Sequence, residues 1–362
     1  MRNCGNLRTV AQPIALTAGL LFLLLHCPLA GHSQQPAPCP RPVVPVGVAL
    51  ADGRMVRGLS AKDFQAKLQG KKATVAAVSR DLSPRRILLL LDARRSMNET
   101  AWKLATILLH ELVSKARAED SLALATFGAE HDIRADFGTS RTELRERLAS
   151  LTAQRPGGKG ADAAGLFASI ESEAGRFALR GYGDAILVFA GKPDYESEAS
   201  AIRAKKILNA SSVRAFGFGL SERASPASYA SLPGARLEAV TIVSLPLNQG
   251  ESVRPALLEQ QLHTIHLADM VRSAGGFLII ENTEAASTTY TLNDARLAAL
   301  QQAVWRMYGN TVEFYRVELD AEFRGGEKID IEISDEIRKK VPGASLLRPE
   351  RLPACGTQPS PD

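Results

Sequence analysis

The sequence has no large excess of charge of either sign and few aromatic residues. Its formal net charge is +5 over 362 residues, and aromatic residues make up 6%. The "RR" pairs at positions 85 and 94 are too short, and too poor in neighbouring aromatics, to predict nucleic-acid binding. With 45% hydrophobic and 23% charged residues, the composition indicates a soluble globular protein with one large core or two smaller ones.

The apolar run near the N-terminus is short for a membrane-spanning helix. "IALTAGLLFLLLHCPLA" follows a weakly basic start and precedes the small residues of "LAGHSQ". We interpret residues 1–33 as a signal peptide, cleaved between Ala30 and Gln34. An uncleaved membrane anchor is the alternative. The signal peptide predicts a secreted or periplasmic protein with no membrane insertion after cleavage.

Cysteine is also scarce. Cys4 and Cys27 would leave with the signal peptide, so the mature chain would keep only Cys39 and Cys355, one near each end. In an oxidising compartment we predict a disulfide between them, which would join the two flanks of the chain into one module. Two free thiols are the alternative, because both cysteines lie in proline-rich stretches.

Catalytic motifs are missing or incomplete. No G-x-S-x-G of a serine hydrolase occurs, and "HELVS" at 110 lacks the second His of a zinc-protease helix. "PGGKGAD" fails as a phosphate-binding loop, because Ala153 and Gly160 occupy the first and last motif positions. His263 and His266 are three apart on a predicted helix without a third metal ligand. The sequence therefore predicts no enzyme.

Apolar runs alternate with amphipathic segments along most of the chain. Several runs are nearly continuous, which indicates strands buried on both faces. The order strand, helix, strand predicts an α/β fold, with a doubly wound, mostly parallel sheet flanked by helices. The predicted strands are 86–92, 121–128, 184–191, 212–219, 239–247 and 276–282, and the predicted helices are 98–119, 140–152, 161–179, 197–210, 258–275 and about 292–309.

The flanks carry a different pattern. Residues 43–78 alternate in polarity and contain turn signals at "DG" and "QGKK", whereas residues 311–337 predict two strands joined by an "RGG" turn. We expect these strands to form a small β-module beside the sheet domain. The predicted domains are 1–33 (signal peptide), 34–84 (N-terminal β flank), 85–310 (α/β domain), 311–354 (C-terminal β flank) and 355–362 (tail).

The main candidate site lies at the carboxyl end of the first α/β strand. Doubly wound sheets bind ligands at the carboxyl ends of strands, and Asp92 ends "RILLLLD". Ser96 and Glu99 have the S-x-x-E spacing of a capping box, so Ser96 is predicted to start the first long helix.

Residues 85–310 resemble the von Willebrand factor type A domain family. The likeness rests on "LLLLDARRSM", "DSLALATFG", the "GG" at 157, "AILVFAG" and "VRAFGFGL". The flanks resemble an exported, acidobacterial-type bacterial subgroup. The resemblance implies a metal-ion-dependent adhesion site made of an Asp-x-Ser-x-Ser turn, a Thr and a second Asp. Such oxygen ligands hold Mg²⁺ or Mn²⁺, which then accepts a partner's carboxylate.

Three of the five ligands that the family pattern implies are absent. Asp92 and Ser96 match, but Arg94 replaces the middle serine and Lys159 the threonine, and Lys192 follows the strand where the second Asp is expected. Close like charges repel by on the order of several kcal/mol, so we expect no metal or other cofactor. The alternative is a rearranged, degenerate site that holds Mg²⁺ or Mn²⁺.

The ligands of that alternative would be Asp92, Ser96, Asp162 and Asp194. For the expected metal-free site, two interpretations remain open. Arg94 either pairs with Asp92 and leaves an inert site, or its guanidinium replaces the metal and accepts a partner's carboxylate. The predicted partner-binding rim consists of Asp92, Arg94, Arg95, Ser96, Lys159 and Lys192.

The sequence thus predicts an exported, non-enzymatic protein-binding or scaffold module with a protein partner. The alternative is a metal-dependent adhesin that binds a partner's carboxylate through a divalent cation.

Overall fold

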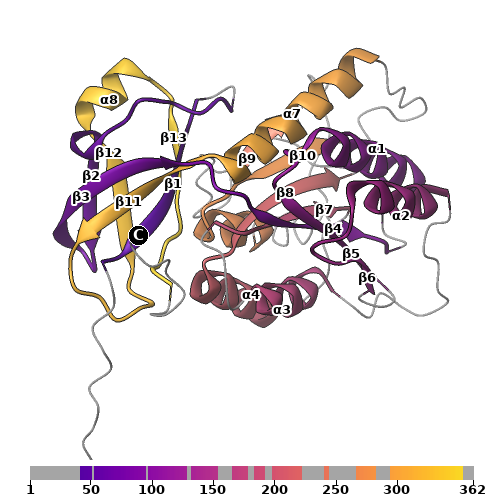
Figure 1. The fold of residues 1–362 in the computed structure, drawn as a ribbon, viewed down its shortest axis with the longest axis horizontal. Coiled ribbons are helices and arrows are strands. Elements are labelled where there is room, and N and C mark those ends of the chain that lie inside the picture. The colour runs from indigo at the N-terminus through magenta and orange to yellow at the C-terminus, as the bar shows by residue number, and fades with distance from the viewer. Residues whose placement is uncertain are drawn as a thin grey trace, which may run out of the picture. The chain divides into compact units, whose positions relative to one another are not determined.

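Two sheets form the framework of the chain (Figure 1). The structure is a computed structural model, and it describes residues 41–50, 53–94, 97–128, 132–153, 165–177, 183–191, 198–221, 240–243, 266–282 and 294–353. One sheet has seven strands and the other has six.

The seven-stranded sheet belongs to the predicted α/β domain. Its strands are β4 (Arg86–Asp92), β5 (Ser121–Phe127), β6 (Asp132–Ala135), β7 (Ala185–Ala190), β8 (Arg214–Ser221), β9 (Val240–Val243) and β10 (Leu278–Asn282). They lie in the order β6-β5-β4-β7-β8-β10-β9. All neighbours pair in parallel except β5 and β6. The sequence does not predict β6, but the mostly parallel α/β sheet is confirmed.

Helices cover both faces of this sheet (Figure 1). They are α1 (Glu99–Lys115), α2 (Arg141–Ala153), α3 (Leu166–Arg176), α4 (Glu198–Ser211), α7 (Asp294–Val312) and a helical segment at 266–273. Leu89 and Leu91 of β4 share a core cluster with α1, α2 and α7, whereas Leu88 and Leu90 share the other with α3, α4 and 266–273. The continuous apolar run of β4 therefore reflects burial on both faces.

The first long helix starts later than the sequence predicts. α1 begins at Glu99, and its N-cap is Asn98, whose Oδ1 accepts a hydrogen bond from the Ala101 N–H at 2.7 Å. The prediction that Ser96 starts this helix is wrong. The Arg94 carbonyl accepts a hydrogen bond from the Met97 N–H at 3.1 Å, two residues before the helix begins.

The six-stranded sheet is antiparallel throughout and is built from both flanks. Its strands are β1 (Val43–Ala49), β2 (Phe64–Leu68), β3 (Lys71–Asp81), β11 (Phe314–Asp320), β12 (Ile329–Ile333) and β13 (Ser345–Leu347), in the order β12-β2-β3-β11-β1-β13. We call this sheet, with the 3-10 turn η1 (Ala61–Asp63) and α8 (Asp335–Lys340), the β-module.

Turns in the β-module agree only in part with the sequence signals. The "QGKK" turn joins β2 to β3, with Gln69 and Gly70 both at positive φ (49° and 77°), as a tight hairpin turn requires. At the "DG" signal, an isolated antiparallel bridge joins Ala49 to Met55, and the Val56 N–H donates to the Val48 carbonyl at 2.7 Å. The strands on either side of "RGG" do not pair, because β11 lies between β1 and β3 while β12 pairs with β2. The pairing of distant strands overrides the local turn signal here.

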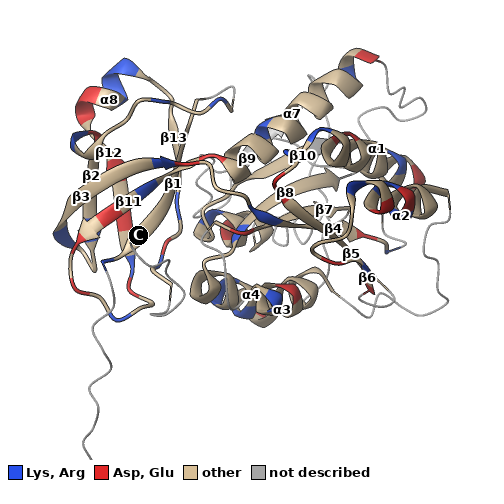
Figure 2. Cartoon of the chain, in the orientation of Figure 1, with Lys and Arg blue, Asp and Glu red and all other residues tan. Residues whose placement is uncertain are grey.

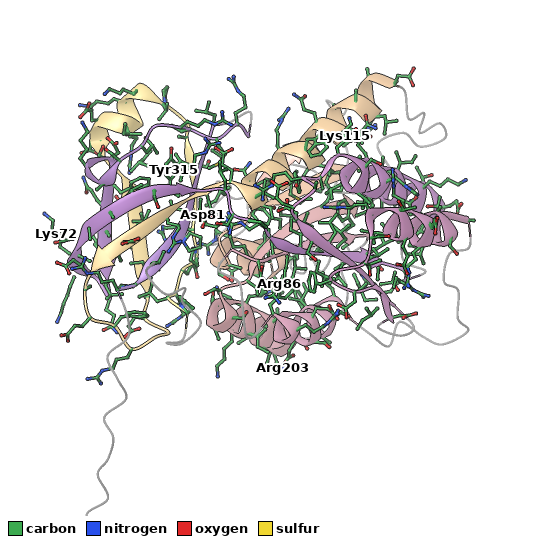
Figure 3. The ribbon with its side chains drawn as sticks, in the orientation of Figure 1. Lys72, Asp81, Arg86, Lys115, Arg203 and Tyr315 are labelled. Carbon is green, nitrogen blue, oxygen red and sulfur yellow. The ribbon has the colours of Figure 1, made fainter. Side chains whose placement is uncertain are left out.

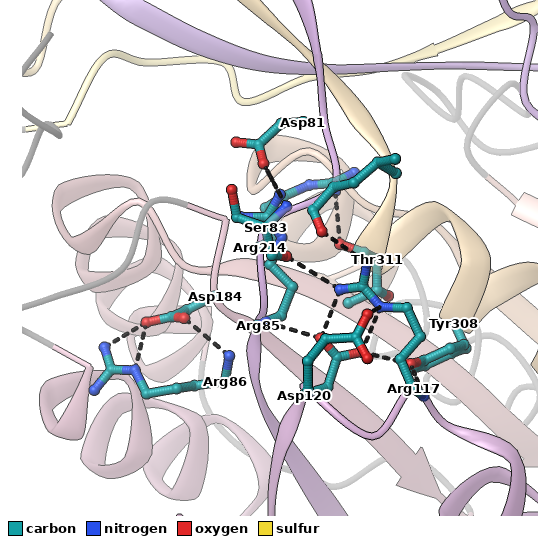
Figure 4. A network of polar contacts seen from close by, with 12 residues as sticks. Asp81, Ser83, Arg85, Arg86, Arg117, Asp120, Asp184, Arg214, Tyr308 and Thr311 are labelled. Atoms are coloured by element: carbon teal, nitrogen blue, oxygen red, sulfur yellow. Dashed lines mark hydrogen bonds and ion pairs between the residues drawn. The ribbon is translucent and has the colours of Figure 1, made fainter. Parts of the chain in front are cut away.

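Buried arginines hold the segment between β3 and β4 (Figure 4). The Arg85 guanidinium donates to Asp81 at 2.6 Å and lies 4.4 Å from the centre of the Phe314 ring. Arg214 lies 5.0 Å from the centre of the same ring and donates to the carbonyl oxygens of Gly275 and Asn310, at 2.9 Å in each case. Phe314, the first residue of β11, is thus packed against two cations.

Asp120 ties α7 to the start of β5 (Figure 4). Its carboxylate accepts hydrogen bonds from the Arg85 N–H at 2.9 Å, from the Arg117 guanidinium at 2.6 Å and from the Tyr308 hydroxyl. Burial alone would raise the pKa of Asp120. The hydrogen bonds from Arg117 and Tyr308 outweigh it, so this pKa lies below its usual value of 3.8 and the group stays ionised.

Gly275 and Gly276 end the helical segment 266–273 against β8. The N–H groups of Gly275 and Gly276 donate to the carbonyls of Arg272 and Val271, with Gly275 at φ 79°, which is a Schellman cap. A Cβ on Gly276 would lie 1.8 Å from the Ala215 carbonyl oxygen. Gly276 therefore allows the chain to enter β10 directly beside β8.

Gly276→Ala should lower the free energy of unfolding by about 3 kcal/mol, because β8 must move away from the new methyl group. Urea unfolding measures the change. The matched control is Gly309→Ala in α7, where nothing lies within 4 Å of an added Cβ. It should stabilise the protein by about 0.5–1 kcal/mol, since alanine is the better helix former. Equal effects of the two substitutions would contradict this account.

Candidate functional site

Asp92 lies where the chain connections diverge to opposite faces of the sheet. It ends β4, which pairs with β5 on one side and β7 on the other. α1, which follows β4, packs on one face, whereas α3, which precedes β7, packs on the other. Doubly wound sheets bind ligands at such a point.

The Asp92 carboxylate is fully buried and accepts four hydrogen bonds. Oδ1 accepts from the Arg94 backbone N–H at 2.9 Å and from Arg94 Nε at 2.8 Å. Oδ2 accepts from Arg94 Nη2 at 2.6 Å and from the Gly191 backbone N–H at 3.0 Å. Four is about the full acceptor capacity of a carboxylate. Arg94 and Gly191 together therefore saturate Asp92.

Small and aromatic neighbours position the two donors. The Arg94 guanidinium lies 4.9 Å from the centre of the Phe127 ring, at the end of β5. Gly191 follows β7, and a Cβ there would lie 2.9 Å from the Cα of Met97. Glycine thus lets the backbone N–H approach Asp92. Sequence reasoning does not single out Gly191, although a glycine directly after a buried strand is itself a signal of close approach.

This arrangement does not fit a divalent cation on Asp92. Mg²⁺ and Mn²⁺ need several oxygen ligands with available lone pairs, whereas the lone pairs of Asp92 are taken by N–H donors. Within the described ranges, no group of three or more His, Cys, Asp or Glu could hold a metal ion. A cation could reach Asp92 only if Arg94 moved away.

Arg94 pairs with Asp92, as the first interpretation of the sequence expects. Both side chains are 0% exposed, so a partner's carboxylate could reach the guanidinium only if Arg94 left Asp92.

The other predicted rim and metal residues lie outside the described residues: Arg95, Ser96, Lys159, Lys192, Asp162 and Asp194. Cys39 and Cys355 lie outside them too, so the disulfide stays a prediction. No described helix has the length and apolar character needed to cross a membrane.

Comparison with known proteins yields structural neighbours alone. No family model and no curated protein matches the chain. A von Willebrand factor type A structure from Catenulispora acidiphila shares 11% identity at a TM-score of 0.41, over 88% of this chain and 75% of that one. An aerotolerance-related membrane protein from Bacteroides fragilis shares 16% at 0.40, over 62% and 98%. Manganese-loaded TRAP from Plasmodium vivax shares 11% at 0.36, over 71% and 81%. Because these TM-scores lie below 0.5, we interpret the site from its own residues.

Arg94→Ala should lower the free energy of unfolding by about 3–5 kcal/mol, because it leaves the Asp92 carboxylate buried without its counter-ion. Chemical denaturation measures the loss. Arg203→Ala is the matched control, since the Arg203 side chain is 54% exposed in its pair with Glu171, and it should cost less than about 1 kcal/mol.

The double variant Asp92→Ala/Arg94→Ala should lose less stability than the two single variants together, because the two charges stabilise each other. Strictly additive losses would show that the pair is not energetically coupled.

Proposed function

We propose that the chain is an exported, non-enzymatic protein-binding module of the von Willebrand factor A type that works without a divalent cation. The observation that carries this proposal is the saturation of Asp92 by Arg94 and Gly191. A cation at this position would offer an open coordination site to a partner. Arg94 instead gives Asp92 a permanent counter-ion that belongs to the chain.

The surroundings of Asp92 also support a role without catalysis. Its described hydrogen-bond donors are the Arg94 guanidinium and the backbone N–H groups of Arg94 and Gly191. A nucleophile or general base would have to contact a reacting atom, and a fully buried, fully hydrogen-bonded carboxylate is not available for that task.

Export rests on the sequence of residues 1–33, with their short apolar run and small residues before position 34. Its test is N-terminal sequencing of protein recovered from outside the cytoplasm. The mature chain should begin between Ala30 and Gln34. A mature protein that still starts at Met1 would contradict export by cleavage.

Divalent cations should leave the melting temperature of the purified protein unchanged within about 1 °C, and a chelator should leave it unchanged as well. A cation present at a hundredfold excess over its Kd would add about 2.7 kcal/mol of stability, which such a measurement detects. Equilibrium dialysis with Mn²⁺ provides the direct readout, and Arg94→Ser, which restores the serine of the family pattern, is the comparison variant. Saturable Mn²⁺ binding by the unaltered chain would overturn the proposal and favour the metal-dependent adhesin.

A further inference from the structure

The end of the β-module at the β2–β3 turn gathers exposed basic side chains. Lys67 of β2 lies directly opposite Lys72 of β3, and Lys71 follows the turn. The Lys72 side chain points away from the sheet (Figure 3). Like charges directly opposite each other destabilise a strand pair. Lys67 also lies directly opposite Asp330 of β12, which offsets part of this repulsion.

Two other segments add cations to the same end. The Gln69 N–H donates to the Lys328 carbonyl at 2.9 Å, which ties the loop between β11 and β12 to the turn. Arg351 forms a bridge with Lys328 and donates from Nη1 to the Gly326 carbonyl at 2.7 Å. Figure 2 shows basic segments at this end of the β-module. We call the exposed cations Lys67, Lys71, Lys72, Arg324, Lys328 and Arg351 the basic tip.

The basic tip contains a shallow, open pocket of about 480 Å³. It is lined by Gln69, Arg324, Gly325, Gly326, Glu327, Lys328 and Arg351. Gly325 and Gly326 both have positive φ, a backbone conformation that glycine adopts without strain. Among the described residues, no acid forms an ion pair with Arg324 or Lys328. Most described arginines of the α/β domain, in contrast, do form an ion pair with an acid.

Glu327 lines the pocket but serves the loop itself. Its Oε1 accepts the Arg324 backbone N–H at 2.7 Å, and its Oε2 is buried. A ligand in the pocket would therefore contact the exposed cations and not Glu327 Oε2.

We propose that the basic tip binds an acidic peptide segment of a protein partner. Carboxylates of the segment pair with Arg324, Lys328 and Arg351. The proposal deepens the protein-binding function proposed above, on which it rests, by assigning it a surface and the chemistry of its partner.

The same residues disfavour nucleic acid as the ligand. No aromatic side chain lines the pocket, so nucleic-acid bases have nothing on which to stack.

Fluorescence anisotropy with the full chain tests the proposal. The probe is a short labelled peptide of alternating Glu and Gly, and the same peptide with Gln in place of Glu is the reference. The Glu peptide should bind, more weakly as salt rises, and the Gln peptide should not. Arg324→Glu/Lys328→Glu should weaken binding at least about tenfold without a change in melting temperature, because both side chains are exposed.

The control is Lys206→Glu/Lys339→Glu, which makes the same change in net charge at exposed positions on α4 and α8. It should keep the affinity within about twofold. Equal weakening in both double variants would overturn the proposal, because net charge alone would then explain binding. Absence of Glu-peptide binding, or tighter binding to phosphatidylglycerol vesicles with the same sensitivity to Arg324→Glu/Lys328→Glu, would also overturn it. Equilibrium dialysis of the same protein preparations with Mn²⁺ tests the metal-independent function separately. Failure of peptide binding at the basic tip can therefore be distinguished from failure of that proposed function.

Discussion

The buried Asp92 carboxylate is the charge around which the carboxyl end of the α/β sheet is organised. A carboxylate removed from water needs nearby compensation, and its cost is otherwise many kcal/mol. The compensation here comes from the second residue after it and from the loop after β7. Because the counter-ion is part of the chain, it does not have to be recruited from solution.

Arginine has the same internal role at the other end of the sheet. Arg85 pairs with Asp81, and Arg214 donates to backbone carbonyls, while both lie against Phe314. A planar guanidinium can form several directed hydrogen bonds and still stack on a ring, which a lysine ammonium cannot do. The segment from β3 into β4 and the start of β11 are therefore held by directional contacts as well as by apolar packing.

Sequence reasoning succeeded where a local pattern sets the structure and failed where distant residues do. The run "ILLLL" predicts a strand buried on both faces, as β4 is. β6 has only four residues and little apolar character, so no period marks it. The S-x-x-E spacing favoured Ser96 as a helix cap, but Asn98, two residues later, offers its own side-chain oxygen to the Ala101 N–H and caps the helix. Gly191 donates through its backbone, which a search for ligand side chains does not detect.

The contrast between paired and unpaired cations bears on where a partner would make contact. Arg94 is neutralised within the fold and is inaccessible, so its charge creates little field outside the protein. The cations around the pocket of the basic tip are exposed, and the described residues offer Arg324 and Lys328 no acid in return. Exposed cations outnumber the single acid, Glu327, around this pocket, and such an excess of positive charge raises the local concentration of anionic groups and speeds their encounter. This contrast supports the proposal that the acidic segment of a partner makes contact at the basic tip.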